Sequence, residues 1–375
     1  MPVIVERMLT QFEYVFNSRS GIFPKTAKRG VTMTISSNNL RNKRIVHSAM
    51  SRLAEASSHD VLRALESIYA PEAEWRGSHP LNEVKGVEAI SSIIWKPLIT
   101  SFPDLERRDT ILMGGTYNGA ELVGAVGHYC GTFLKDWLTI PATGRPVYLR
   151  YGEFHEMVEG KIIRSTVLFD ILDLIRQAGF WPLPPSLGTE EQWPCPITAD
   201  GLLLDEQDAA ESARSLQLTL DMQASLGKYN DLANLGREGL LAMPQREFWH
   251  PKMMWYGPAG IGTTRGLQGF VDYHQLPFRT AFPNRRGGNH YVRIGDGKYS
   301  ATGGWPSVFA THDGGGFLGT GPTGREVSMR VMDFYLADGD LIRENWVPLD
   351  IIHLLLQMDV DVFARMQSFF RRGKN

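Results

Sequence analysis

Cysteine is nearly absent from this chain: Cys130 and Cys195 are the only two among 375 residues. Two cysteines cannot build the disulfide framework of a small secreted protein, and they cannot supply a thiolate metal site. This scarcity favours a reducing compartment, so we expect a cytoplasmic protein without a structural metal.

Long apolar runs and an excess of one charge are also missing. No apolar run approaches the roughly 20 residues of a membrane-spanning helix, and residues 1–49 lack the apolar segment of a secretory signal. The 39 Lys and Arg residues nearly balance the 41 Asp and Glu residues, which gives a formal net charge of -2. We therefore expect neither nucleic acid nor a membrane as a partner.

Sequence motifs for cofactors and nucleophiles are absent as well. The segment GPAGIGTTRG, residues 257–266, is glycine-rich but has neither P-loop nor dinucleotide-binding spacing. There is no Gly-x-Ser-x-Gly motif, and no closely spaced histidine pair lies near an acidic residue. We therefore expect no cofactor and no metal.

What the chain does contain is an internal repeat with an offset of 180 residues. The stretch GRPVYLRYGEFHEMVEGKIIRSTVLFDILDLIRQ at 144–177 returns at 324–357 as GREVSMRVMDFYLADGDLIRENWVPLDIIHLLLQ. Upstream, the same offset relates Pro71 to Pro251, Trp75 to Trp255, Gly77 to Gly257, Gly86 to Gly266, Pro97 to Pro277, and Phe102-Pro103 to Phe282-Pro283. The chain is therefore a tandem duplication of one domain.

Hydrophobic periodicity predicts helices first and strands second in both copies, which is typical of an α+β fold with an antiparallel sheet. In the first copy we expect helices over 50–69 and 87–101, strands over 111–113, 122–133, 147–158 and 162–169, and a last helix over 170–178. In the second copy we expect helices over 208–226, 232–243 and 267–282, strands up to 349, a helix over 350–357 and a further C-terminal helix. The expected divisions are an irregular N-terminal extension over 1–49, a domain over 50–180, a Pro-rich linker over 181–207 and a second domain over 208–375.

Each copy resembles a SnoaL-like polyketide cyclase domain of the NTF2-like superfamily. The resemblance lies in the Trp-x-Gly turn, the helix ending in Phe-Pro, and the final helix of the form Asp-(apolar)-x-x-Leu-x-x-Gln, and it covers residues 50–180 and 208–366. It implies two cone-shaped domains, each a curved antiparallel sheet with helices, that pair as an intramolecular pseudo-dimer. It is specific for fold rather than substrate, because the superfamily hosts cyclases, isomerases, epoxide hydrolases, dehydratases and non-catalytic binders.

Asp170 and Asp350 each stand between the last strand and the last helix of a copy. An aspartate at this position can simply cap the helix; in an apolar cavity, its pKa would rise and it could act as a general acid or base. The resemblance implies the catalytic role, with His155 as the partner of Asp170 and Tyr335 in the corresponding place of the second copy. Because imidazole titrates near neutral pH and phenol does not, we expect the first copy to be the stronger candidate for catalysis.

A second layer of charged candidates comprises Arg150 with Glu153 and Arg330 with Asp333. Residues three apart on a strand point to opposite faces, so one of each pair should face the interior. A buried arginine would need a partner such as Asp170 or Asp350. The arrangement is either a structural ion pair or, by the same resemblance, the Asp–Arg–Asp set with which an NTF2-like epoxide hydrolase activates water.

Histidines and large aromatic residues complete the set of candidates. They can fill the core, or they can form the wall of a pocket for a ring-bearing small molecule. The candidates for substrate contacts are Trp75, His128, Tyr129, Arg150, Trp255, Tyr256, His290, Trp305, His312, Arg330, Asp333 and Trp346.

These patterns leave three hypotheses for function. The first is a cofactor-independent enzyme that performs acid/base chemistry on a carbonyl-bearing small molecule, as in an aldol-type cyclisation, an isomerisation or a lyase step. The second is a hydrolase that adds water to an epoxide or a similar electrophile. The third is a tandem module that binds a small molecule without catalysis. Formation of a homo-oligomer is compatible with all three.

Overall fold

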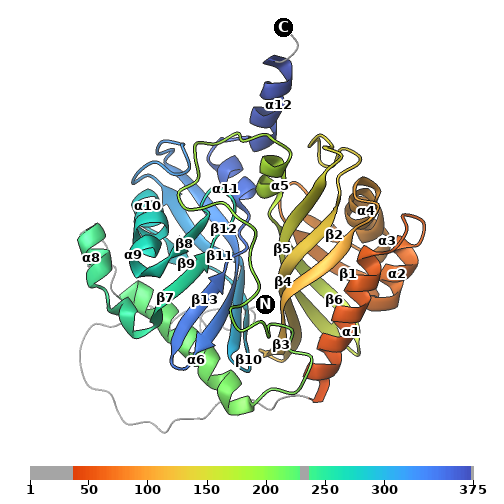
Figure 1. Cartoon of the computed structure of the whole chain (residues 1–375), viewed down its shortest axis with the longest axis horizontal. Helices are drawn as coiled ribbons and strands as arrows, with labels where there is room; N and C mark the ends of the chain where they lie inside the picture. Colours follow the sequence, from red (N-terminus) through yellow and green to blue (C-terminus); the bar gives the residue numbers. More distant parts are fainter. Residues whose placement is uncertain (1–36, 229–235, 373–375) are drawn as a thin grey trace, which may run out of the picture. The chain divides into compact units, whose positions relative to one another are not determined.

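Each repeat folds as one curved sheet. Helices cover the side that faces away from the other repeat, and one short helix of each repeat, α5 (Ile171–Gln177) or α11 (Ile351–Gln357), lies near the centre, between the two sheets (Figure 1). The computed structural model describes residues 37–228 and 236–372, and both repeats belong to a single unit that begins at Thr34. Among these residues, no helix is long and apolar enough to cross a membrane.

The sheet of the first repeat has six strands in the order β2-β1-β6-β5-β4-β3. Its elements are α1 (Ser37–Ala54), α2 (Val61–Ile68), β1 (Tyr69–Gly77), β2 (Glu83–Lys85), α3 (Val87–Ala89), η1 (Ile90–Trp95), α4 (Lys96–Ser101), β3 (Glu106–Tyr117), β4 (Ala120–Thr132), β5 (Pro146–Val158), β6 (Lys161–Phe169) and α5 (Ile171–Gln177).

The sheet of the second repeat has the equivalent strand order, which reads β8-β7-β13-β12-β11-β10 in the same direction. In addition, β9 pairs with β11. Its elements are α6 (Ala209–Lys228), α8 (Arg237–Ala242), η2 (Pro244–Glu247), β7 (Trp249–Tyr256), β8 (Thr263–Arg265), α9 (Gly266–Phe270), η3 (Val271–Gln275), α10 (Leu276–Ala281), β9 (Arg286–Gly287), β10 (His290–Asp296), β11 (Tyr299–His312), β12 (Arg325–Asp338), β13 (Leu341–Trp346), α11 (Ile351–Gln357) and α12 (Val362–Arg372).

The predicted α+β class and the arrangement of two curved sheets with helices are confirmed, but the sheets are mixed rather than purely antiparallel. The first strand of each repeat, β1 or β7, runs parallel to the last strand, β6 or β13. No strand was predicted at either place, and the segment APEAEWRG of the first repeat is rich in charge and contains a proline. In β1, three buried residues, Ala73, Trp75 and Gly77, alternate with less buried ones, so tertiary packing outweighs the weak local strand preference.

The Trp-x-Gly motif has a steric cause in both repeats. A Cβ atom on Gly77 would lie 2.0 Å from the ring of Trp75, and one on Gly257 would lie 2.2 Å from the ring of Trp255. Residues i and i+2 share one face of a strand, so the indole folds over the glycine. The motif therefore reports core packing at the end of β1 and β7.

The helix predicted over 87–101 is confirmed as the continuous run of α3, η1 and α4, and the second copy has the same arrangement in α9, η3 and α10. The central segment is π-helical in both, directly before Pro97 and Pro277. Proline lacks an N–H donor and clashes with the carbonyl one turn earlier, and a widened turn accommodates both effects.

The two sheets pack against each other through the faces that their own helices leave free. Phe154 of β5 and Phe334 of β12 occupy equivalent positions in the two repeats and stack at 5.1 Å with an interplanar angle of 13°. Gly124 and Gly303 make room for this stack, since a Cβ atom on either would approach the Phe154 ring to 2.7 Å. The surrounding apolar cluster draws on strands of both repeats, which confirms the pseudo-dimer.

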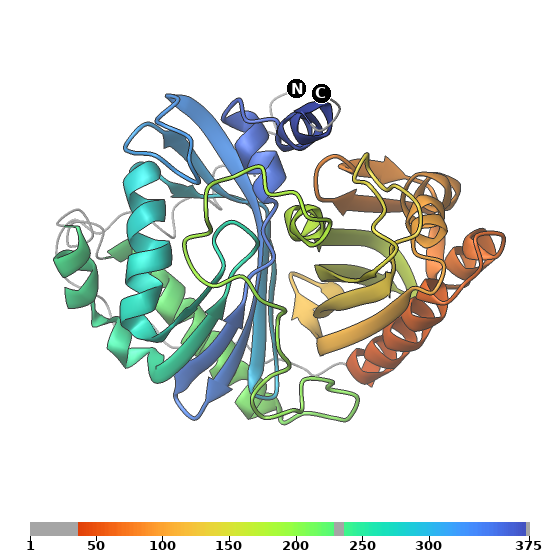
Figure 2. The same cartoon turned by 45° about the horizontal axis from the view of Figure 1, so that its top comes forward.

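The segment between the repeats lies against both of them (Figure 2). Trp193 and Leu203 are buried in the apolar cluster between the sheets. The backbone pairs with an edge of each sheet, through Leu202 with Leu112 of β3 and through Thr189 with Thr263 of β8. Covering an exposed strand edge removes a site for unwanted strand pairing.

The expected irregular extension is wrong for residues 37–49, which form most of α1; residues 1–36 lie outside the described part of the chain. Val46, Met50 and Leu53 of α1 are buried in the core of the first repeat. Lys43 is 1% exposed and forms a 2.7 Å ion pair with Asp296 of β10, which is 3% exposed. Helix α1 therefore joins the two repeats.

We predict that Lys43→Met will lower the free energy of unfolding at pH 7 by about 3–5 kcal/mol, because it leaves Asp296 as a lone buried charge. Denaturant titration followed by circular dichroism measures the change. Arg52→Met is the matched control on the exposed side of α1 and should change stability by less than about 0.5 kcal/mol. Equal stability of the two variants would show that the ion pair does not hold α1 in place.

Candidate functional site

Asp170 caps helix α5 and at the same time binds the other repeat. Its Oδ1 accepts the N–H of Asp173 at 3.1 Å, as expected for an N-cap. Its Oδ2 accepts the N–H of Ala259, from the second repeat, at 2.9 Å and lies 2.7 Å from Nη2 of Arg150. Burial raises the pKa of Asp170, and the charge of Arg150 opposes that rise.

Asp350 of the second repeat makes the equivalent contacts with the first repeat. It caps α11 through the N–H of His353 at 3.1 Å, accepts the N–H of His79 of the first repeat at 2.9 Å, and pairs with Arg330 at 3.1 Å. The two aspartates line a common cavity of about 10 Å³, room for about one water molecule. Each carboxylate thus caps a helix of its own repeat and accepts a hydrogen bond from the backbone of the other repeat.

The expectation that His155 and Asp170 share a cavity is wrong. The β5–β6 hairpin places His155 opposite Ser165, whereas the N–H of Asp170 bonds to the carbonyl of Arg150. Positions 150 and 155 are five residues apart on β5, which corresponds to about 17 Å along a strand. In the second repeat Asp350 likewise bonds to Arg330, five residues from Tyr335.

The interior of repeat one, meaning the face of its sheet that its helices cover, holds a buried chain of charged groups. Arg107 of β3 lies 2.8 Å from Asp109 and 2.6 Å from Glu153 of β5. Nε2 of His155 lies 2.9 Å from Glu153, and Nδ1 of His47 on α1 lies 2.8 Å from Asp109. An arginine therefore bridges two acids, each of which also has a histidine neighbour.

Tyrosine and serine hydroxyl groups form further hydrogen bonds with these charged groups. Tyr129 accepts a hydrogen bond from Arg107 at 2.9 Å, and the hydroxyl of Tyr151 donates to Asp109. Ser165 connects His155 to the hydroxyl of Tyr69. The side chains of Arg107, Glu153 and His155 have no exposed surface, and only His47, whose side chain is 34% exposed, reaches solvent.

The acids of repeat one are held in their ionised form. Burial alone would raise the pKa of Glu153, but the charges of Arg107 and His155 outweigh burial and lower it to about 2. Burial likewise opposes ionisation of Asp109, and Arg107 together with hydrogen bonds from His47 and Tyr151 lowers its pKa.

The interior of repeat two has a carboxylate at the same position without a cation. Asp333 of β12 is the counterpart of Glu153, and Asn345 of β13 donates to it at 3.4 Å. Burial raises the pKa of Asp333 to about 6, although hydrogen bonds from Asn345 and Tyr335 favour its ionised form. No lysine or arginine within the described ranges forms an ion pair with Asp333, so nothing offsets burial as Arg107 does in repeat one.

Strand pairing shows what has changed around this carboxylate. Arg107 pairs with Tyr129 on β4, while its counterpart Gly287 pairs with Val308 on β11. Tyr151, two residues before Glu153, corresponds to Val331, two residues before Asp333. A guanidinium and two phenol rings are thus replaced by glycine and two valines. As a result, Asp333 and Val331 are partly exposed, whereas Glu153 and Tyr151 are buried.

The remaining predicted site residues divide by location. Arg150, Arg330, Tyr256, Trp305 and Trp346 lie at the contact between the repeats, where Arg150 covers the ring of Trp193 and Arg330 covers that of Trp305. Trp75, Trp255 and His312 are buried in the cores, and Tyr129 lies in the interior of repeat one. His128 is buried with its pKa lowered to about 4, chiefly by burial, and His290 is partly exposed at the start of β10.

The opposite-face argument for the arginine and acid pairs is confirmed, since Arg150 meets Asp170 at the contact between repeats while Glu153 faces the interior. The polar interior residues that were not predicted from the sequence include Arg107, Asp109, His47, Gln223 and Asn345. The spacing of Arg107 and Asp109, two apart on a strand, was the available signal, because it places both charges on one face.

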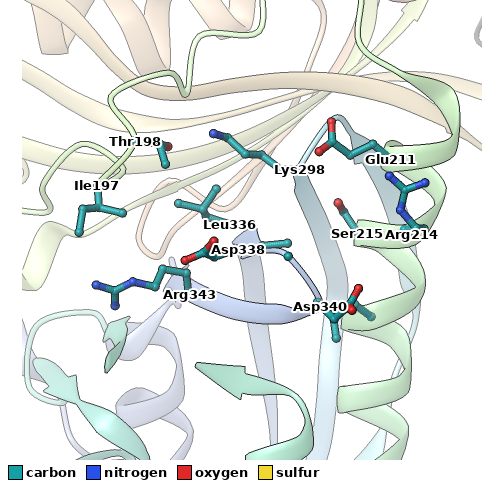
Figure 3. A pocket seen from close by; sticks show the side chains of 13 residues that line it. Ile197, Thr198, Glu211, Arg214, Ser215, Lys298, Leu336, Asp338, Asp340 and Arg343 are labelled. Atoms are coloured by element: carbon teal, nitrogen blue, oxygen red, sulfur yellow. The ribbon is translucent and has the colours of Figure 1, made fainter. Parts of the chain in front are cut away.

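A further pocket, with a volume of about 440 Å³, lies elsewhere. Figure 3 shows that α6, the linker and the turn between β12 and β13 surround it with mixed charges, including Arg214, Lys298 and Asp338. It contains none of the residues predicted from the sequence.

Residues 226–358 match the model of the family described as SnoaL-like polyketide cyclase. No curated protein matches the chain.

Similar solved structures include a candidate SnoaL-like polyketide cyclase from Jannaschia sp. CCS1, with 18% identity over 40% of this chain and 97% of that one and a TM-score of 0.33. They also include IdmH, a candidate polyketide cyclase from Streptomyces antibioticus, with 20% identity over 36% and 97% of the two chains and a TM-score of 0.30. An NTF2-like protein from Burkholderia thailandensis E264 has 22% identity over 37% and 96%, with a TM-score of 0.28.

The two equivalent acids should affect stability with opposite signs. The pKa of Asp333 is about 6 when folded, above its ordinary 3.8, so the folded state binds more protons between these values and loses stability as pH rises. Asp333→Asn should therefore gain stability relative to the unsubstituted protein between about pH 4 and 6 and keep that gain at pH 8. The melting temperature measured across this range tests the sign.

For Glu153 the folded pKa is about 2, below its ordinary 4.5, so its contribution is present above pH 4.5 and is lost as pH falls through 2. Glu153→Gln should accordingly lower the melting temperature at pH 7, with the difference shrinking below about pH 4.5. Effects of the same sign for both substitutions would contradict the opposite environments described above.

Proposed function

We propose that this chain, whose second repeat matches the model of the SnoaL-like polyketide cyclase family, is a cofactor-independent acid/base enzyme acting on a carbonyl-bearing small molecule. We place the reacting groups on Asp333 and Tyr335 in the interior of repeat two. Asp170 and Asp350, the aspartates at the strand-to-helix junctions, serve instead to join the repeats.

The observation that carries the proposal is the state of Asp333. It is partly exposed, and burial raises its pKa to about 6. A general base works best when its pKa lies near the operating pH, since it must be ionised and still basic. In the duplicated position Glu153 has a pKa of about 2 and is closed off by Arg107 and two tyrosines, which makes it a poor proton acceptor.

The chemistry follows from the two side chains. The Asp333 carboxylate takes a proton from the carbon next to the substrate carbonyl, and the electron pair of that C–H bond moves onto the carbonyl oxygen. The hydroxyl of Tyr335, two residues along on the same face of β12, donates a hydrogen bond to the Asp333 carboxylate and holds it in the orientation in which it accepts the proton. The enolate carbon then attacks a second carbonyl, and protonated Asp333 returns its proton to the new alkoxide. All atoms balance without an external cofactor.

Repeat one has a different role in this proposal. Its interior is occupied by the chain from His47 through Arg107 to His155, and its acids are ionised and paired. That state fits a domain that stabilises its partner, and α1 contributes to this through Lys43. We therefore propose repeat two, rather than repeat one with its His155, as the site of turnover.

A second candidate is addition of water to an epoxide or a similar electrophile in repeat one. It is favoured by Arg107, which bridges the two acids Asp109 and Glu153, and by the oxygens of Glu153, which accept no hydrogen bond of ordinary geometry from the described residues. One acid would take a proton from water as its oxygen bonds to carbon, and the other would protonate the departing oxygen. The lowered pKa values of both acids weigh against it, because neither keeps a proton to give at neutral pH.

We predict that Asp333→Asn will lower the rate of α-proton exchange by about 10²–10⁴, the usual contribution of a positioned general base. The assay follows deuterium uptake from D₂O into a panel of 1,3-diketones and β-ketoesters by NMR. With the unsubstituted protein, catalysed exchange should fall as pH drops below about 6, because a base must be ionised.

Asp340→Asn, in the exposed turn after β12, is the control and should leave the rate unchanged. Full activity of Asp333→Asn would refute the assignment. Loss of activity in Glu153→Gln alone, with turnover of an epoxide and uptake of ¹⁸O from water, would favour the second candidate.

A further inference from the structure

We propose that Gln223 of α6 is a positioning residue for the acid/base pair of repeat two and holds the Tyr335 hydroxyl so that its proton points toward Asp333. This inference rests on the function proposed above. The juxtaposition that carries it is one amide group in contact with two hydroxyls beside the Asp333 carboxylate.

The direction of each hydrogen bond follows from the chemistry of the amide. Nε2 of Gln223 lies 2.9 Å from Oγ1 of Thr302 and 3.2 Å from the hydroxyl oxygen of Tyr335. An amide nitrogen carries two hydrogens and can only donate, so both oxygens accept. The tyrosine hydroxyl has one proton, which is then free to point at Asp333, the next residue on the same face of β12.

Helix α6 holds Gln223 rigidly enough for this task. Ser215, Thr219 and Gln223 are spaced by four residues and form one stripe on the helix. Ser215 donates to the carbonyl of Gly297 at 2.9 Å, and Thr219 bonds to Ser300 at 2.7 Å. The stripe therefore fastens α6 to the start of β11, and Gln223 is its last member, at the level of Asp333 and Thr302, which pair across β12 and β11.

Repeat one has different hydrogen bonds at the corresponding position. His155 stands where repeat two has Tyr335, and its ring contacts Ser165 and Glu153 directly. The helix α1 contributes His47, which reaches Asp109 rather than His155. A bond from the covering helix to the hydroxyl beside the carboxylate is thus a feature of repeat two.

The test measures the pKa of Asp333 directly and needs no substrate. The carboxyl ¹³C shift of Asp333 is followed against pH in protein labelled on aspartate, and the signal is assigned by its loss in Asp333→Asn. Gln223→Met, which removes the donor at similar size, should raise this pKa by about 0.5–1 pH unit, equivalent to one neutral hydrogen bond. Gln217→Met, at an exposed position of the same helix, is the matched control and should leave the pKa unchanged.

A double-mutant cycle separates positioning from general structural support. If Gln223 acts through Tyr335, Gln223→Met should have no effect on the pKa of Asp333 in the Tyr335→Phe background. Gln223→Glu should raise the pKa further than Gln223→Met, since a carboxylate draws the tyrosine proton toward itself and adds a like charge. An equal shift in both backgrounds, or no shift in any variant, overturns the inference.

The exchange assay then distinguishes a failure of the proposed function from a failure of the proposed role of Gln223. Loss of exchange in Asp333→Asn together with no pKa shift in Gln223→Met would retain the function and reject the role of Gln223. A pKa shift that passes through Tyr335 without any catalysed exchange would retain the hydrogen-bond chain and reject the function.

Discussion

The packing of the two sheets through Phe154 and Phe334 decides where the charged residues of β5 and β12 can lie. Successive side chains point to opposite faces of a strand. Because these phenylalanines lie between the repeats, the side chains of Glu153, His155, Asp333 and Tyr335 point into the two interiors. The same alternation sends Arg150 to the contact between repeats, where it meets Asp170. The contact between these two equivalent phenylalanines thus determines which polar side chains lie in the interiors and which lie at the contact between the repeats.

The duplication lets one position be compared in two environments. In repeat one a carboxylate, Glu153, lies beside an arginine and stays ionised. In repeat two its counterpart, Asp333, forms no ion pair with any lysine or arginine that the structure describes, and it holds its proton to higher pH. Desolvation acts on both, and the presence or absence of the Arg107 charge decides the sign of the shift. The replacements of Arg107, Tyr129 and Tyr151 by Gly287, Val308 and Val331 also decide which carboxylate meets solvent.

Asp170 and Asp350 show how a sequence feature that resembles a catalytic motif can have another physical explanation. Each accepts one N–H from its own helix and one from the opposite repeat, and each pairs with an arginine. These hydrogen bonds and ion pairs stabilise the junction, while burial raises the pKa of Asp170 to about 6 and also raises that of Asp350. Their near-identical surroundings in the two repeats follow from the approximate two-fold relation between them.

The duplication, the α+β class, the Pro-rich connection and most helices and strands could be read from the sequence, because they depend on periodicity and on residues such as glycine and proline with local effects. Strands β1 and β7 could not, since their few apolar residues gain meaning only beside β6 and β13. Helix α1 was hidden for a similar reason, because Lys43 is polar in sequence and buried only through Asp296, 253 positions away. The interior networks of Arg107 with Glu153 and of Gln223 with Tyr335 join different elements, and only tertiary structure brings them together. The resemblance to a known family implied a site at the strand ends, at Asp170 and Asp350. The folded arrangement leads us to propose Asp333 in the middle of β12 instead, a partly exposed carboxylate that forms no ion pair with the described residues.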